Sequence, residues 1–211
     1  LQQWLIHSSI TLAAFMAVET IQPLRDLSKR QINRLEIVNE ISRQIISTLE
    51  TKQLLALINA ALENALNADT YYIGIMDGEN IHMQLFYDEG EYYNDILVKK
   101  EGALSGWVID NQKTLCLPDL RKPIDLEGVD TVIIGKQKAS LSWMGIPMKG
   151  THVNGVMVIA SYHPNAFDKS DLELLSNIAQ RAALALDNTY NHALVQEEAR
   201  LDSLTRVYNH G

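Results

Sequence analysis

The sequence predicts an α/β fold, and residues 142–188 carry the observations that predict it. A strand that alternates between two faces begins at Ser142, and a turn follows at residues 149–152. The next run, 153–161, is almost wholly apolar and rich in Val and Ile, which is typical of a central strand buried on both faces. After a polar break, apolar residues recur at helical spacing from Leu172 to Leu186. This segment therefore predicts strand, turn, strand, loop and long helix.

Capping residues support the start of that helix. Asp168 is a good N-cap residue, and Asp171 lies three positions further on, where a carboxylate favours the positive end of a helix. We therefore expect the helix to begin just after Asp168.

The same segment closely resembles the C-terminal half of a GAF domain, a small-molecule sensing module of signalling proteins. The positions that match the family pattern are Ser142, Ile146, Pro147, Gly155, Phe167, Asp171, Ala185 and Asn188. The resemblance implies an α/β (α+β) fold with a six-stranded antiparallel sheet. Long N- and C-terminal helices would cover one face of the sheet, and a small ligand pocket would lie on the other.

Composition limits the possible functions. A chain of 211 residues fits one domain with extensions, and its net charge of −8 lacks the basic face that binding to nucleic acid requires. A single cysteine precludes an internal disulfide and is consistent with the cytoplasm, where we expect the protein to act.

The first 30 residues are expected to form a separate helical segment. Residues 1–22 resemble the closing helix of the chain itself, so we interpret them as the end of an upstream GAF-like domain or a signalling helix. A truncated membrane anchor is the alternative, but polar residues interrupt the roughly 20 apolar residues that a membrane span needs, and we expect no membrane contact. Because the sequence starts at Leu1 rather than Met, we expect it to be part of a longer chain.

A GAF domain is expected over residues 31–190. Its first helix, within residues 24–49, carries an apolar stripe that faces either the core or a second subunit. The stripe consists of Ile37, Val38, Ile41, Ile45 and Leu49. Thr51 is expected to cap a second helix with buried positions from Leu54 to Ala65.

Strands and a short helix are expected between these helices and Ser142. Runs 70–76 and 81–87 flank an Asp-Gly turn and predict a hairpin, followed by a polar loop at 88–93 and a further strand or sheet edge at 95–99. Residues 101–108 match a GAF turn into a short helix that ends near Asn111, and 115–119 match the next strand. In GAF domains the region equivalent to 121–139 covers the ligand pocket.

Residues 191–211 are expected to be a helical linker and the first residues of another domain. The segment Asp202–Gly211 resembles the opening of GGDEF domains, the diguanylate cyclases that join two GTP molecules into cyclic di-GMP. The signature loop and metal-binding carboxylates of that family are not among these residues, so no catalytic residue is expected here.

Five residues are candidates for lining a ligand pocket, although the sequence does not decide which strand face looks into it. They are Tyr72, Met76, Trp107, Cys116 and Met144. We expect Cys116 to be a buried, inert thiol, and the absence of a Cys-His pair disfavours a bilin.

Other site chemistries find little support. Gly102–Gly106 lacks the spacing of a phosphate loop or a nucleophile elbow, so its glycines are interpreted as turn residues. Scattered histidines do not predict a zinc site, and haem is disfavoured because His82 is interpreted as a partly exposed strand residue. The signature of cyclic-nucleotide-binding GAF domains is missing. The sequence therefore requires no cofactor or metal and does not identify the ligand.

The resulting hypothesis is a sensory module that binds an unknown small molecule or relays a signal to a C-terminal diguanylate cyclase. Because two cyclase domains must meet, a parallel homodimer through the first and last long helices is expected. The last-helix contact would use Leu186, Tyr190, Leu194 and Leu201. The alternatives are a structural dimerisation spacer with a filled pocket and a GAF-fold methionine sulfoxide reductase, for which Cys116 has no partner cysteine.

Overall fold

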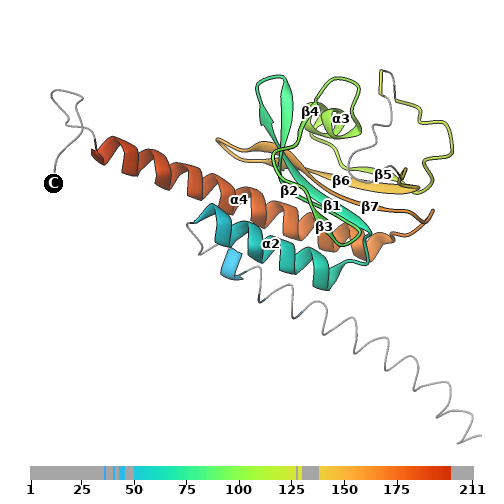
Figure 1. The fold of residues 1–211 in the computed structure, drawn as a ribbon, viewed down its shortest axis with the longest axis horizontal. Coiled ribbons are helices and arrows are strands. Elements are labelled where there is room, and N and C mark those ends of the chain that lie inside the picture. The colour runs from blue at the N-terminus through green and yellow to red at the C-terminus, as the bar shows by residue number, and fades with distance from the viewer. Residues whose placement is uncertain are drawn as a thin grey trace, which may run out of the picture.

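The structure, a computed structural model, is a sheet with helices on both faces (Figure 1). It describes residues 36, 40, 43–45, 50–126, 128–129 and 138–200, and for 198–200 the backbone alone. The helices are α2 (Thr51–Ala65), α3 (Leu104–Asn111) and α4 (Lys169–Arg200). The strands are β1 (Thr70–Asp77), β2 (Asn80–Asp88), β3 (Glu91–Tyr92), β4 (Leu97–Lys99), β5 (Leu115–Leu117), β6 (Ser142–Lys149) and β7 (Asn154–Ser161).

The sheet is antiparallel and has seven strands rather than the expected six. Its order is β3-β2-β1-β7-β6-β5, and β4 pairs with β2 outside this path. The additional strand is β3, which has only two residues and lies within the stretch expected to be a polar loop. β7 lies between β1 and β6, and the last seven of its eight residues are buried, which confirms the central strand predicted from its apolar run.

Helices α2 and α4 cover one face of the sheet (Figure 1). The stripe predicted for α2 is buried from Leu54 to Ala65, and it packs with Ile178 and Ala182 of α4 against strand residues that include Met157. Ile45, one of the few described residues before α2, is fully buried in this same core. Its side chain therefore belongs to the interior of the domain.

The shorter helix α3 packs on the opposite face, where a second core forms. Val108 of α3 is fully buried there among Phe86, Trp143 and Val156 from three different strands. The alternation of side chains along each strand explains why successive residues enter different cores. Trp143 belongs to the α3 side and Met144 to the α4 side.

The capping predictions have different outcomes. At α4, the carboxylate of Asp168 accepts hydrogen bonds from the backbone N–H groups of Ser170 (2.7 Å) and Asp171 (3.0 Å). The Asp171 carboxylate accepts in return from the Asp168 N–H at 2.9 Å, which completes a capping box and confirms the prediction. At α2, Thr51 is already the first helical residue, Glu50 is the N-cap, and no side chain caps the helix.

A carboxylate from α4 also holds the turn between β6 and β7. Asp187 accepts backbone hydrogen bonds from Thr151 at 3.0 Å, His152 at 2.6 Å and Val153 at 3.1 Å. The turn approaches so closely that a Cβ on Gly150 would lie 2.7 Å from Asp187 Cγ. The hairpin tip and α4 are thus fastened together at the point where the helix leaves the sheet (Figure 1).

Several predictions concern residues outside the described part of the chain. They are the helical segment 1–30, the stripe residues Ile37, Val38, Ile41 and Leu49, the dimer residue Leu201, and the GGDEF-like segment 202–211. Among the described residues, no helix has both the length and the apolar character needed to cross a membrane.

Candidate ligand pocket

A cavity of about 260 Å³ lies on the α3 side of the sheet. This is slightly below the roughly 300–1,000 Å³ common for ligand pockets, so the cavity suits a small molecule. Strands, the start of α3 and the segment before β6 all contribute to its wall. The lining residues are Thr70, Tyr72, Phe86, Val98, Ala103, Leu104, Ser105, Leu120, Arg121, Lys138, Ala139, Ser140, Leu141, Trp143 and Ala160.

A small polar cluster is buried within this mostly apolar lining. The Tyr72 hydroxyl lies 2.9 Å from Ser105 Oγ, and the Trp143 indole N–H donates to the Tyr72 oxygen at 3.3 Å. Tyr72, Ser105 and Trp143 are only 7%, 4% and 5% exposed, respectively. Burial raises the pKa of Tyr72, while the bonds from Ser105 and Trp143 act in the opposite direction. Tyr72 therefore stays a neutral phenol that can donate its proton.

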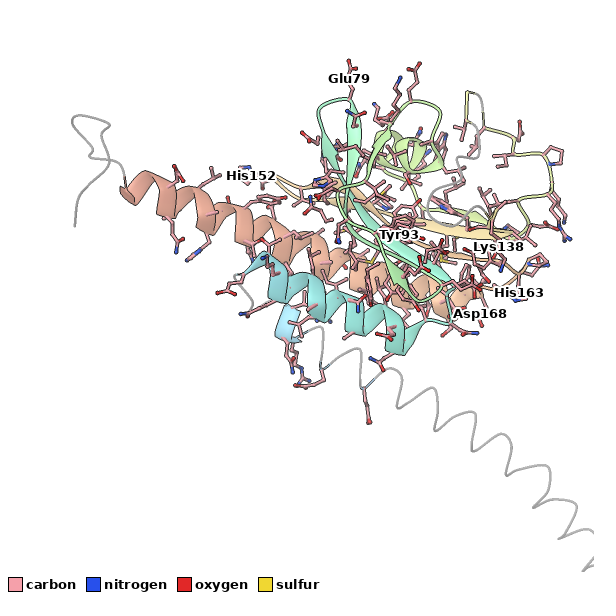
Figure 2. The ribbon with its side chains drawn as sticks, in the orientation of Figure 1. Glu79, Tyr93, Lys138, His152, His163 and Asp168 are labelled. Atoms are coloured by element: carbon pink, nitrogen blue, oxygen red, sulfur yellow. The ribbon has the colours of Figure 1, made fainter. Side chains whose placement is uncertain are left out.

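Two cationic side chains belong to the same lining. Arg121 bonds to Asp119 through Nε and one terminal nitrogen, both at 2.8 Å, and this pairing lowers the pKa of Asp119 to about 2. Lys138 lies 3.6 Å above the ring centre of Tyr162 and pairs with Glu89 at 3.7 Å. Lys138 lies just before β6, and Figure 2 shows it at the end of the sheet opposite His152 of the β6–β7 turn.

The five residues expected at the pocket are not brought together. Tyr72 lines the cavity, whereas Met76 packs at the edge of the α3-side core. Trp107 lines a separate groove between α3 and the β1–β2 turn. Met144 faces α2 and α4 on the other side of the sheet, because its neighbour Trp143 occupies the α3 face. A ligand-binding role for these residues stays a prediction, and the geometry of the cavity supports Tyr72.

Cys116 also departs from expectation, because its side chain is exposed rather than buried. It lies on β5, which pairs with β6 and ends the strand order, so no further described strand pairs with its outer edge. Partial burial still raises the pKa of the thiol. A raised pKa leaves less thiolate at neutral pH, so Cys116 is not an activated nucleophile.

Sequence reasoning missed Ser105 and Trp143. Ser105 lies within the Gly102–Gly106 turn, and its place as the second residue of α3 signals no pocket by itself. Trp143 had a detectable signal in Gly145, which lies two residues along the same strand and therefore on the same face. A Cβ on Gly145 would overlap the indole ring, so this glycine leaves room for Trp143.

The described part of the chain offers no group of three or more His, Cys, Asp or Glu side chains placed to hold a metal ion. The lining of the cavity suits non-covalent binding, with an apolar wall that contains a few hydrogen-bond donors. This is the usual composition of a small-molecule site.

A sheet with two helices on one face and a short helix over a small cavity on the other defines an α+β module with room for a small molecule. The family model described as "GAF domain" matches residues 48–187, which is more than half of the chain. The chain therefore belongs to the GAF domain family, whose members are generally sensory or regulatory. No curated protein matches the chain in sequence.

Solved structures with the same fold come from proteins of differing function. The GAF domain of a phosphoenolpyruvate-protein phosphotransferase from Coxiella burnetii is 17% identical, with a TM-score of 0.64 over 78% of this chain and 98% of that one. The free methionine-R-sulfoxide reductase of Neisseria meningitidis, solved with its substrate, is 14% identical, with a TM-score of 0.59 over 77% and 93%. A segment of a methyl-accepting chemotaxis protein is 12% identical, with a TM-score of 0.58 over 72% and 98%. At these identities the comparison shows the fold alone.

Proposed function

We propose that this chain is a cytoplasmic sensory module that binds a small molecule between α3 and the sheet and transmits its occupancy along α4. The cavity with its buried Tyr72–Ser105–Trp143 cluster is the observation that carries the proposal. A buried polar cluster that lines an apolar cavity suits ligand recognition, because desolvated donors favour a partner that satisfies them.

The connection to α4 supports a relay. Trp143 and Ala160 line the cavity from β6 and β7, and the turn that joins these strands is bound to Asp187 of α4. If the hairpin can take two positions, a ligand that binds one of them more tightly shifts the equilibrium toward that position. Because the hairpin is bound to α4, the helix would move with it, and the difference in affinity sets the size of the shift in the equilibrium. Because α4 continues to Arg200, it leads toward the GGDEF-like segment, and a diguanylate cyclase is the output that we propose.

A parallel homodimer through α4 is part of the same proposal. Tyr190 and Leu194 of the expected contact are exposed, at 36% and 52%, together with Leu184 and Val195. Leu186, by contrast, is 1% exposed within the domain core and is removed from the proposed contact. Exposed apolar side chains along the helix that leads to the output suit pairing with a second copy.

Ligand binding can be tested by filling the cavity. Ala160→Leu adds volume at a lining residue that is 2% exposed, and circular dichroism verifies that the variant folds. Native mass spectrometry of freshly purified protein should show a bound small molecule in the wild type and its loss in the variant. A folded wild type that retains no small molecule and gains no thermal stability from a metabolite panel would favour the structural spacer instead.

The relay can be tested separately by hydrogen exchange. Ligand addition should change protection in residues 149–153 and in α4, not only around the cavity. Asp187→Ala should leave binding intact while it uncouples the change in α4. Protection changes confined to the cavity would contradict the relay.

A further inference from the structure

The start of α3 forms part of the cavity wall. Ala103 is the N-cap residue and no side chain caps the helix. For the N–H groups of Leu104, Ser105 and Gly106 the described residues supply no recorded acceptor. Ala103, Leu104 and Ser105 all line the cavity. The N-terminal end of a helix carries partial positive charge and attracts anions.

The buried cluster of Tyr72, Ser105 and Trp143 contains one more hydrogen-bond donor than the bonds within the cluster use. Tyr72, Ser105 and Trp143 together carry three N–H or O–H groups, while the bonds among them use two. Whichever hydroxyl donates within the Tyr72–Ser105 bond, the other hydroxyl proton lacks a recorded acceptor among the described residues. Both hydroxyl-bearing side chains are more than nine-tenths buried and line the cavity. A ligand that places an acceptor here satisfies a donor that water reaches poorly.

The charged side chains of the lining have a single sign. Arg121 and Lys138 are cationic, and none of the described lining residues is acidic. Their carboxylate partners, Asp119 and Glu89, lie outside the lining. The recorded bonds of Arg121 use two of the five N–H donors of a guanidinium, so its charge can also serve a ligand.

From the helix terminus, the surplus hydroxyl donor and the single-sign lining, we infer that the cavity takes a small organic anion. The ligand has an apolar body that packs on Phe86 and Trp143, and a carboxylate or similar oxyanion that accepts hydrogen bonds from the cavity wall. This inference rests on the proposed ligand-binding function and adds the chemical class of the ligand.

Two small molecules of nearly the same shape, one charged and one neutral, distinguish the contribution of charge to binding from that of shape. 3-Fluorobenzoate and 3-fluoronitrobenzene differ in the charge of one planar group, and fluorine NMR reports the affinity of each for the full 211-residue protein. We expect the carboxylate to bind about tenfold or more tightly than the nitro compound, because charge-assisted hydrogen bonds are the stronger ones. The advantage should decrease with added salt.

A matched pair of lysine variants locates the effect. Lys138→Gln removes a cation from the lining at a side chain that is 53% exposed, so the fold should tolerate it. We expect it to weaken 3-fluorobenzoate binding about threefold to tenfold and to leave 3-fluoronitrobenzene binding unchanged, as loss of one partly screened charge predicts. Lys122→Gln removes the same charge outside the lining and should change neither affinity by more than about twofold.

The possible results are distinguishable. Equal affinities for the two probes, with binding abolished in Ala160→Leu, would overturn the anion preference and leave the ligand-binding function in place. Binding of neither probe would overturn the inference, and an empty wild type in native mass spectrometry would then also reject the proposed function. Equal losses in Lys138→Gln and Lys122→Gln would also overturn the inference, because the effect would then be one of net charge.

Discussion

Asp187→Ala tests the connection between α4 and the β6–β7 hairpin. The Asp187 carboxylate is 8% exposed and accepts three backbone N–H groups, so alanine removes all three acceptor contacts at once. Loss of the carboxylate does not cost the same free energy at each of the three backbone amides. Thr151 and His152 are exposed, and water can replace the carboxylate, whereas Val153 is 1% exposed and its N–H would stay buried without an acceptor.

The magnitude follows from this difference. An unsatisfied buried N–H group costs about 1–3 kcal/mol, and each exchange of a carboxylate for water at the exposed amides adds up to about 1 kcal/mol. We therefore expect Asp187→Ala to lower the free energy of unfolding by about 1–5 kcal/mol. Asp187→Asn keeps the oxygen that serves His152 and Val153 but turns an amide N–H₂ toward Thr151, so its loss should be about half as large.

Urea denaturation followed by circular dichroism measures these losses. Glu173→Ala is the matched control, because it removes an exposed carboxylate from the same helix. We expect the control to stay within about 0.5 kcal/mol of the wild type. Asp187→Ala with the stability of the control would refute the reasoning that this carboxylate holds the hairpin.

The pH dependence of stability tests independently whether the ionised Asp187 carboxylate stabilises the fold. Burial alone would raise the pKa of Asp187, but the three backbone N–H bonds outweigh it and the pKa lies below its ordinary value. A lowered pKa in the folded state means that the stabilisation is complete above the unfolded-state pKa of about 3.9 and is lost as the pH falls through the lower folded value. The stabilising contribution of Asp187 should therefore persist as the pH falls from 7 to 5, and the difference between wild type and Asp187→Ala should shrink only below about pH 4.

Three further predictions test other parts of the fold. Gly155→Val should destabilise the domain by about 1–3 kcal/mol, because a Cβ would meet the Gly74 carbonyl oxygen and lie 2.7 Å from Ile75 Cδ1; an unchanged denaturation midpoint would contradict this packing. Asp168→Ala should cost about 1 kcal/mol through loss of the α4 cap, measured in the same way, and a stability equal to that of the wild type would exclude the capping role. Iodoacetamide should label Cys116 completely in the native protein but more slowly at pH 7 than in urea, because its pKa is raised; protection from labelling would contradict its exposure.

Local signals predicted the elements well. The Asp-Gly step produced the β1–β2 hairpin, with Gly78 at a φ of +60°, and helical spacing produced the buried stripe of α2. These features depend on backbone preferences and on periodicity within a few residues. The short strand β3 escaped prediction because it forms by pairing with β2 rather than by any preference of its own, whereas β4 lies within the strand or sheet edge expected at 95–99.

The pocket was harder to predict because its residues come from distant parts of the chain. Tyr72 was predicted to line a pocket, while Ser105 and Trp143, which bond to it, lie 33 and 71 residues further along. No local pattern indicates that these three side chains meet. The alternation of β6 separated its residues into two faces, yet the pattern did not say which face meets the cavity, and Met144 was predicted to line it where the structure places Trp143.

The sequence by itself therefore determined the GAF family, the order of the helices and main strands, and the division of each strand into two faces, because these depend on spacing along the chain. Only the tertiary structure decided which face looks into the cavity, that Cys116 lies exposed at a sheet edge, and that Asp187 binds the hairpin turn. The physical reason is that burial and hydrogen bonding at these positions depend on which segments pack against them. A strand of period two has the same pattern whichever way it faces, and the neighbouring helices make that choice.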